Sequence, residues 1–367
     1  MKLNFWSPIL GTSGYASHGR NLARALVQQG VDLGVDALDY NPAHAHQVPD
    51  EIKQCLNKGY DFEPTVGNIL PPYFPIKTSD HLPAFFGYVV FEGTKMQQDW
   101  VDAINHEGVT KILVPSTHVM DACRNSGVHK HTAIVPHGFD EKVFHPEVQP
   151  NKELREDHFK FLYVGGWKDG ARDRKGLDIA LRAFADEFKH DEKAVFYAKI
   201  NGAYQNPLTV QQNLKEIGLR KAEERAEIVL LFNTVTDDVL AKTYKAADVL
   251  VAPSKAEAFN MPVLEAMACG TPSIVTNYGG PQDYVNSSNG YLLDIDGMAP
   301  ATGERHIYQN AEWSVPSYDH LRRLMRHCFD NRDEVKTRGA NAAEDVKNRT
   351  WADTAKTLLQ VVGDVGA

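Results

Sequence analysis

Hydrophobic positions in this chain of 367 residues follow two patterns that alternate along its length. Short apolar runs, typical of buried strands, are followed by segments in which apolar residues recur at helical spacing. The first unit consists of an alternating strand at Lys2 to Ser7, a turn at Gly11-Thr-Ser-Gly14 and a helix that carries apolar residues from Leu22 to Val27. Strands that alternate with helices predict parallel, doubly wound α/β sheets.

The same alternation continues through the first half of the chain. Further strands are expected at 31–38, 85–90, 111–114 and 133–135, and helices near 95–106 and 117–126. The stretch 41–83 is rich in Pro, Gly, Asn and His, and we expect it to be irregular.

A break in the pattern separates two such series. Prolines and charged residues interrupt the alternation from His145 to Asp157, before a new apolar strand begins at Phe159. We therefore predict an N-terminal domain at 1–150, a second domain at 151–345 and a C-terminal helical segment at 346–367. In the second series, strands are expected at 159–164, 194–200, 228–232, 249–252 and 272–276, and helices at 177–188, 318–329, 333–347 and 351–362.

Two carboxylates lie across one predicted strand-to-helix turn of the second series. Glu257 and Glu265 are separated by seven residues, so that Glu257 lies in the loop and Glu265 on the helix. A carboxylate beside the end of a buried strand can accept hydrogen bonds from ligand hydroxyls. The amides of 260–263 open the helix and can bind an anion. One turn could hold both the hydroxyls and the phosphate of a sugar nucleotide.

A basic loop follows the first strand of the same domain. Gly165 and Gly166 end that strand, and Arg172, Arg174 and Lys175 precede the next helix. A bound diphosphate needs cations as well as amides, and this loop is placed to supply them. The alternative is a solvated, mobile basic loop without a ligand.

Composition narrows the classes of function. With 43% hydrophobic and 24% charged residues the chain resembles an ordinary soluble protein, and a net charge of −9 argues against nonspecific binding of polyanions. No secretory leader and no run of about 18 apolar residues is seen, which favours a cytoplasmic protein and leaves a peripheral membrane contact open. The four cysteines, which we expect to be buried and inert, have no metal-ligand spacing: Cys55, Cys123, Cys269 and Cys328.

An ordered set of motifs over nearly the whole chain resembles the retaining GT-B glycosyltransferases of family 4, also described as glycosyl transferases group 1. The motifs are Gly14, Val135-Pro-His-Gly138-Phe-Asp140, Tyr163-Val-Gly165 with Arg174-Lys175-Gly176, and Glu257-x7-Glu265 with Ala-Met-Ala-x-Gly270-Thr-Pro272. The resemblance implies two Rossmann-like domains that face each other across a cleft, and a C-terminal helix that crosses back to the first domain.

The resemblance also implies roles for individual residues. Glu265 would bind the ribose hydroxyls, Glu257 the hydroxyls of the donor sugar, and Lys175 the diphosphate. Gly14 and Gly165 would let backbone approach the donor closely. The amides of the phosphate cradle would come from Phe259, Asn260, Met261, Pro262 and Val263. The alternatives are that the glutamates cap a helix or lie on the surface, and that Gly14 is a plain turn glycine.

Two positions depart from the family pattern. Relatives often carry an arginine directly after the glycine that corresponds to Gly165, where this chain has Gly166; Arg172 or Arg174 would substitute, and Lys168 is a weaker candidate. Many relatives also have a histidine near the reacting carbon of the sugar, where this chain has Glu92. Glu92 would either take a polar role beside the donor sugar or be a buried or capping carboxylate.

The histidines and one acidic pair raise further possibilities. His137 follows a strand and is expected to line the cleft, where it would touch the acceptor or the donor sugar. The pairs His44-Ala-His46 and His129-Lys-His131 are read as solvated loop residues, and Asp294-Ile-Asp296 as a turn, so no metal site is predicted.

The function expected from the resemblance is transfer of a sugar, with retention, from a UDP- or GDP-linked donor to an acceptor hydroxyl. The leaving phosphate would help take the acceptor proton. An epimerase acting on a sugar nucleotide and a non-catalytic sugar-nucleotide-binding protein are the competing hypotheses. The acceptor stays open among glycan, lipid, small molecule and modified nucleic acid, as does the oligomeric state.

Overall fold

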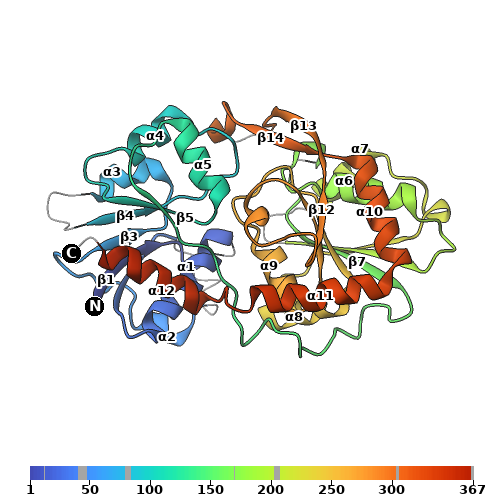
Figure 1. Ribbon diagram of the computed structural model, residues 1–367, viewed down its shortest axis with the longest axis horizontal. Coiled ribbons are helices and arrows are strands. Elements are labelled where there is room, and N and C mark those ends of the chain that lie inside the picture. The colour runs from blue at the N-terminus through green and yellow to red at the C-terminus, as the bar shows by residue number, and fades with distance from the viewer. Residues whose placement is uncertain are drawn as a thin grey trace. The chain divides into compact units, whose positions relative to one another are not determined.

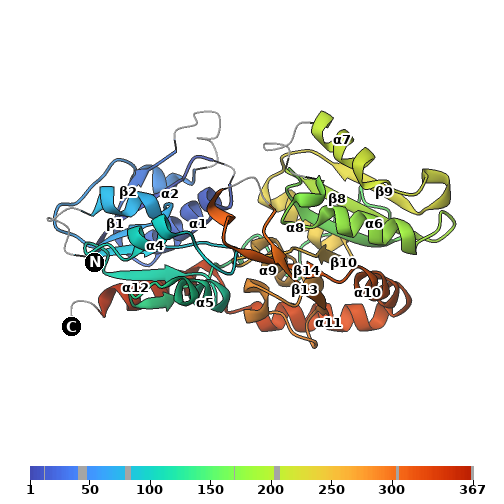
Figure 2. The same cartoon turned by 90° about the horizontal axis from the view of Figure 1, so that it is seen from above.

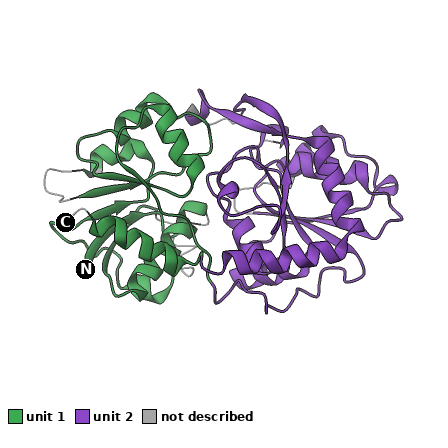
Figure 3. Cartoon of the chain, in the orientation of Figure 1, with its two compact units in different colours: residues 1–140, 349–367 green, residues 141–348 purple. Residues whose placement is uncertain are grey.

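The computed structural model describes residues 1–11, 13–39, 48–78, 84–168, 170–201, 207–302 and 306–364. The chain divides into two compact units (Figure 3). Unit 1 consists of residues 1–140 and 349–367, and unit 2 of residues 141–348. The division thus falls after Asp140, whereas the sequence placed it after residue 150.

Unit 1 is a parallel sheet covered by helices (Figure 1). In its described part the strand order is β2-β1-β3-β4-β5-β6, and every neighbouring pair is parallel. The strands are β1 (Lys2–Ser7), β2 (Asp32–Ala37), β3 (Thr65–Gly67), β4 (Phe85–Tyr88), β5 (Lys111–Val114) and β6 (Thr132–Ile134). The helices are α1 (Gly14–Gln28), α2 (Asp50–Lys53), α3 (Phe74–Lys77), α4 (Gln98–Ile104), α5 (Thr117–Ser126) and α12 (Trp351–Gly363).

The stretch expected to be irregular contributes a strand to the middle of this sheet. β3 lies between β1 and β4, and α2 and α3 fall in the same stretch. The expectation was wrong because a strand of three residues is too short to show a period of two. Its assignment depends on the strands that pair with it on both sides.

The last helix, α12, is an integral part of unit 1. Thr350 caps it with a capping box, and the amide of Trp351 donates to the carbonyl oxygen of Phe139 at 3.2 Å. Thr354 donates through Oγ1 to the carbonyl oxygen of Pro136 at 2.9 Å. A Cβ at Gly138 would lie 2.4 Å from the backbone of Thr350, so the chain can approach so closely only at a glycine.

Unit 2 is a second parallel sheet with an added hairpin. In its described part the strand order is β12-β11-β10-β7-β8-β9, and β13 and β14 form the antiparallel hairpin. The strands are β7 (Phe159–Gly165), β8 (Ala194–Ile200), β9 (Glu227–Leu231), β10 (Val249–Ala252), β11 (Ser273–Thr276), β12 (Tyr291–Leu293), β13 (Ile295–Pro300) and β14 (Glu312–Pro316). The helices are α6 (Leu177–Glu187), α7 (Pro207–Ile217), α8 (Asp237–Ala246), α9 (Met261–Ala268), α10 (Tyr318–Asp330) and α11 (Arg332–Val346).

Helices cover both faces of this sheet (Figures 1 and 2). On one face, side chains of α6, α7 and α10 join alternate residues of β7 and β8 in a hydrophobic core that includes Phe161, Phe184 and Phe196. Helices α8 and α9 pack on each other and lie on the other face. The β10-α9-β11 crossover that carries the two glutamates is parallel, as predicted.

The acidic pair Asp294 and Asp296 does not lie in a simple turn, as the sequence suggested. Ile295 begins β13, and the pairing with β14 is irregular between Ile295 and Gly297. Gly297 has a φ of 145°, which a side chain rarely permits. A β-bulge therefore accounts for the turn-like composition.

Candidate functional site

The basic loop after β7 has a defined conformation. The carboxylate of buried Asp173 accepts hydrogen bonds from the amides of Lys168, at 2.6 Å, and Lys175, at 2.8 Å. Gly176 has a φ of 70°, and a Cβ there would lie 2.2 Å from the carbonyl oxygen of Pro253. The loop is therefore held by its own side chains and by the start of the next loop, in contrast to the solvated, mobile alternative.

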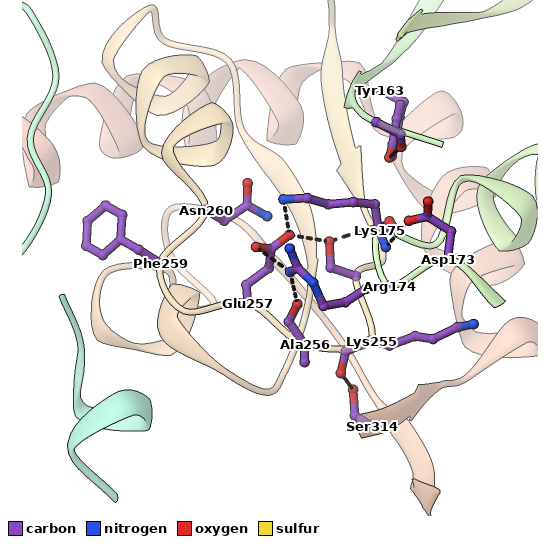
Figure 4. Close-up of polar contacts among 12 residues, drawn as sticks. Tyr163, Asp173, Arg174, Lys175, Lys255, Ala256, Glu257, Phe259, Asn260 and Ser314 are labelled. Carbon is purple, nitrogen blue, oxygen red and sulfur yellow. Dashed lines mark hydrogen bonds and ion pairs between the residues drawn. The ribbon is translucent and has the colours of Figure 1, made fainter. Parts of the chain in front are cut away.

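Glu257 gathers the cations of this loop (Figure 4). Its Oε1 lies 2.7 Å from Nζ of Lys175, and its Oε2 lies 2.9 Å from a guanidinium nitrogen of Arg174. Ser254 donates through Oγ to Oε1 at 2.9 Å. Burial leaves Glu257 5% exposed and pushes its pKa upward, but Lys175 and Arg174 outweigh this effect and hold the pKa at about 2. The carboxylate is ionised at neutral pH.

Of the two candidates for the missing arginine, the structure brings Arg174 to Glu257. Arg174 also donates to the carbonyl oxygen of Ala256, so its guanidinium is fixed at both the side chain and the backbone of the glutamate loop. Arg172 is exposed, and its carbonyl oxygen accepts from Oγ1 of Thr302 at 3.2 Å. Arg174 is therefore the candidate that lies at this carboxylate, and its role as a substitute for the family arginine stays a prediction.

Lys255, which sequence reasoning missed, ties the basic loop to the hairpin. Its amide donates to the carbonyl oxygen of Arg174 at 2.8 Å, and its Nζ donates to that of Ala171 at 2.7 Å. The carbonyl oxygen of Lys255 accepts from the amide of Ser314 at 2.9 Å and from its Oγ at 2.6 Å (Figure 4). Its only sequence signal was its place beside Glu257.

The start of α9 offers fewer amides than the sequence suggested. Pro262 has no N–H to donate, and the amide of Val263 donates to the carbonyl oxygen of Asn260 at 3.1 Å. Among the described residues, the amides of Asn260 and Met261 have no recorded acceptor. The phosphate cradle expected over 259–263 stays a prediction, with fewer amides available to it than the sequence suggested.

Phe259 and Asn260 are held by a tyrosine. Tyr284 donates through its hydroxyl to the carbonyl oxygens of Phe259, at 2.7 Å, and Asn260, at 2.9 Å. Asn260 has a φ of 75°, which directs the chain into the helix without a side-chain cap. In Figure 4 the ring of Phe259 points away from the ion pairs of Glu257.

Glu265 has the opposite electrostatic environment to Glu257. Its Oε2 accepts from the hydroxyl of Tyr244 on α8 at 3.1 Å. Burial, together with the nearby Asp237, raises the pKa of Glu265 to about 8. Without a ligand, the carboxyl is mostly protonated at neutral pH.

In unit 1, the glycine turn after β1 is held by two residues that the motif search did not identify. Asp39, just beyond β2, accepts from the amides of Ile9 at 2.6 Å, Leu10 at 2.9 Å and Gly11 at 2.6 Å. Arg20 donates to the carbonyl oxygens of Ile9 and Gly11 at 2.8 and 2.6 Å. An acidic residue after the second strand of a Rossmann-like unit was the available signal.

Gly14 begins α1 and is exposed. The hydroxyl of Ser13 caps this helix by accepting from the amide of Ala16 at 3.1 Å. The glycine therefore lies at the first turn of a capped helix, and its role toward a ligand stays a prediction.

His137 is buried among aromatic rings of unit 1, whereas the sequence suggested a side chain lining a cleft. Its ring centroid lies 4.5 Å from that of His18, 5.8 Å from Tyr88 and 6.1 Å from Trp351. Burial and the neighbouring His18 hold the pKa of His137 well below its ordinary value. The ring contributes to the packing of α12 on unit 1.

Glu92 lies in the loop that follows β4 and is partly exposed, between buried Phe91 and Gly93. Its role beside the donor sugar stays a prediction. Of the histidine pairs, His129 and His131 are exposed, as expected, and His44 with His46 lies outside the described residues.

Two general expectations concern cysteines and metals. All four cysteines are free and buried, which confirms their predicted state. Within the described ranges, no group of three His, Cys, Asp or Glu side chains is arranged to hold a metal ion. In the same ranges, no helix has the length and apolar character needed to cross a bilayer.

Comparison with known proteins places the site in a family. Residues 158–305, which contain the basic loop and both glutamates, match the family described as glycosyl transferases group 1. The chain is 28% identical over 238 residues to D-inositol 3-phosphate glycosyltransferase of Paenarthrobacter aurescens, covering 62% of this chain and 50% of the relative. It is 26% identical over 271 residues to GDP-mannose-dependent alpha-mannosyltransferase of Corynebacterium glutamicum, covering 73% and 55%. The chain thus spans about half the length of these curated relatives.

The similarity to solved structures extends over nearly the whole chain. Sucrose-phosphate synthase of Thermosynechococcus elongatus has a TM-score of 0.72 at 16% identity, covering 100% of this chain and 99% of that one. HepE of Anabaena, in complex with UDP and glucose, has a TM-score of 0.70 at 14% identity, covering 99% and 100%. Because these identities are low, the likeness concerns the fold. Residues 158–305 thus resemble the group 1 glycosyltransferases, and the two parallel-sheet Rossmann-like units of the chain have the GT-B fold.

Proposed function

We propose that this protein transfers a sugar, with retention of anomeric configuration, from a nucleotide-diphosphate sugar to an acceptor hydroxyl. The main support for this proposal is the cluster of Glu257, Lys175 and Arg174 beside the start of α9. It combines two cations, a carboxylate and a helix N-terminus in one place, which matches the charges and hydroxyls of such a donor.

The cluster suggests how the donor is received. Without a donor, Glu257 neutralises both cations, so neither is left buried and unpaired. A diphosphate would bring its own negative charge to Lys175 and Arg174. Glu257 would then be able to accept hydrogen bonds from hydroxyls of the donor sugar, the role that the family resemblance implies.

The reaction needs little chemistry from protein side chains. The bond between the sugar C1 and the β-phosphate oxygen breaks, and the bond from the acceptor oxygen to C1 forms on the same face. The acceptor proton passes to an oxygen of the departing phosphate. Lys175 and Arg174 would stabilise the charge that develops on the diphosphate, and Glu92 is proposed to take a polar role beside the sugar.

The donor is proposed to carry UDP or GDP. One relative is named for its dependence on GDP-mannose, and HepE was solved with UDP and glucose. In this proposal, cationic side chains rather than a metal ion neutralise the negative charge of the diphosphate. The acceptor is assigned no further than a hydroxyl compound.

Two measurements test the proposal. A thermal-shift screen of UDP, GDP, ADP and their sugar conjugates identifies the donor, because a ligand that binds the native state raises the unfolding midpoint. The identified donor is then incubated without acceptor. Slow release of free sugar supports a transferase. A changed sugar still attached to the nucleotide would indicate an epimerase, and an unchanged donor would indicate a binding protein.

A further inference from the structure

A further lysine, Lys199, lies at the carboxyl edge of the unit 2 sheet. Lys199 is the penultimate residue of β8 and is 8% exposed. Its Cα pairs with that of Val164 on β7, one residue before Gly165, and with that of Leu231 at the end of β9. It therefore lies at the carboxyl ends of the strands, where open α/β sheets bind their ligands.

The side chain of Lys199 projects away from the main hydrophobic core. Ala198 and Ile200, its neighbours in β8, belong to the core formed with α6, α7 and α10. Because successive side chains of a strand alternate between faces, Lys199 points to the face of α8 and α9. Glu265, the proposed ribose ligand, is carried by α9, which packs on β10 and β11 of the same sheet.

The ammonium of Lys199 has no partner within the described parts of the chain. It makes no recorded hydrogen bond or ion pair there, and burial lowers its pKa without a recorded carboxylate to oppose the shift. The Nζ atom is not among the fully buried polar atoms that lack a partner, so the apolar stem is covered while the ammonium stays accessible. A ligand oxygen at this edge of the sheet can therefore reach it.

Lys160, a lysine of the same sheet with a structural role, provides a comparison for Lys199. It is 9% exposed and lies near the amino end of β7. Its Nζ is 3.2 Å from Oδ2 of Asp248 and donates to the carbonyl oxygen of His158 at 3.1 Å. The two lysines are similarly buried, but only the one at the ligand edge of the sheet lacks a partner in the described chain.

We propose that Lys199 is a further cation of the donor site and donates to an oxygen acceptor of the bound nucleoside diphosphate. The inference rests on the proposed function, since it assumes that a nucleotide occupies this edge of unit 2. A phosphate oxygen and a carbonyl oxygen of the base are the two possible acceptors, and both require the same unpaired ammonium.

The test combines stability with binding in Lys199→Met, and uses Lys160→Met as the matched control. Lys199→Met should leave the thermal unfolding midpoint within about 2 °C of the wild type, because it breaks no ion pair of the described chain and keeps the apolar stem. It should also weaken nucleotide binding, measured by calorimetry, by about tenfold or more. Lys160→Met should lower the midpoint and leave nucleotide affinity unchanged.

Calorimetry with UDP, GDP and ADP separates the two acceptors. Equal fractional losses for each nucleotide that binds assign Lys199 to phosphate. Losses confined to UDP and GDP assign it to a base carbonyl, which adenine lacks. Unchanged affinity in Lys199→Met, or a lowered midpoint like that of the control, would overturn the inference. If the wild-type protein bound none of the three nucleotides or their sugar conjugates, the proposed function itself would fail.

Discussion

At the scale of residues, Glu257 and Glu265 lie in one crossover but have opposite protonation states. Two cations hold the pKa of Glu257 at about 2, while burial and Asp237 raise that of Glu265 to about 8. Both carboxyls lose water, so the difference comes from the charges that replace it. Glu257 is an ionised partner for cations, and Glu265 is mostly neutral at pH 7.

Donor binding should therefore depend on pH through Glu265. If the ribose hydroxyls bind the carboxylate form, donor affinity should rise by roughly tenfold per pH unit between pH 6 and 8 and then level off. Glu265→Gln should bind more weakly and lose this dependence. Calorimetry with the intact sugar nucleotide avoids the ionisation of a terminal phosphate. Equal pH profiles in both proteins would contradict the assignment.

The stability of the ligand-free protein should change with pH in the opposite direction to donor affinity. Because the folded pKa of Glu265 exceeds its ordinary value of 4.5, the native state holds a proton that the unfolded chain releases between pH 4.5 and 8. This contribution is fully present below pH 4.5 and is lost as the pH rises toward 8. Chemical denaturation of the ligand-free protein should show this decline in the wild type and a smaller one in Glu265→Gln.

Lys175 should act mainly on the rate of transfer. Lys175→Ala should lower turnover by roughly ten- to a thousandfold, because a positioned cation stabilises charge on the leaving diphosphate. Steady-state kinetics with the identified donor measure this effect. Lys193→Ala, at an exposed lysine of the same unit, serves as the control. Undiminished turnover in Lys175→Ala would remove the residue from the site.

At the scale of elements, the cationic loop depends on segments far from it in the chain. Lys255 donates to the carbonyl oxygens of Ala171 and Arg174, and Ser314 of β14 fixes the carbonyl oxygen of Lys255. Each hydrogen bond contributes only about 1 kcal/mol. Together they position Arg174 and Lys175, so the hairpin supports the site although it contains none of the predicted donor-binding residues.

Lys255→Met should consequently impair catalysis more than folding. We expect about a tenfold loss in kcat/KM for the donor, with a change of only a few degrees in the unfolding midpoint, because the loop loses one anchor and keeps that of Asp173. Lys255→Arg should recover part of the loss if donation to Ala171 is the cause. Full activity in Lys255→Met would show that the hydrogen bond from Nζ to Ala171 is not needed to position the loop.

At the scale of the whole molecule, unit 1 is completed by the last segment of the chain. Trp351 of α12 stacks on His18 of α1 with ring centroids 5.6 Å apart, and His137 lies between other rings of the same cluster. Burial lowers the pKa of His18 to about 3, against a weaker opposing effect of Asn68. The cluster thus favours neutral imidazoles.

As the pH is lowered, unit 1 should therefore lose stability before the carboxylates of unit 2 are protonated. The folded pKa of His18 lies below its ordinary 6.5, so the unfolded chain binds more protons between pH 6.5 and 3. Stability falls as the pH drops below 6.5, by about 1.4 kcal/mol per pH unit for each such histidine. His18→Phe should reduce this slope in denaturant titrations, whereas His129→Phe, at an exposed site, should not. Parallel profiles for His18→Phe and the wild type would contradict this reading.

Much of the fold was predictable because its signals are local. Strand and helix periods identified most of the elements of both sheets, and the β10-α9-β11 crossover was predicted with both glutamates in their observed positions. Periodicity failed for β3, whose three residues carry no period, and for α7, α8 and the hairpin. The domain boundary was displaced because prolines near 146–150 were taken for the linker, although the division falls after Asp140.

The contacts among the predicted site residues could not be predicted from the sequence. Lys175 and Glu257 were assigned to different parts of a donor, yet they meet at 2.7 Å across 82 positions of sequence. Nothing local distinguished Arg174 from Arg172, or Lys199 from Lys160. Those distinctions depend on which carboxylate or carbonyl oxygen the fold places opposite each cation.

The sequence by itself determined the doubly wound architecture, the glycines at tight turns and the spacing of the two glutamates, because period and spacing are properties of neighbouring residues. The tertiary structure alone decided that Glu257 is ionised, that Glu265 is mostly neutral and that Lys199 is buried without a partner in the described chain. The physical reason is that burial and the electrostatic field at a side chain arise from residues brought together by folding, and a sequence pattern does not specify them.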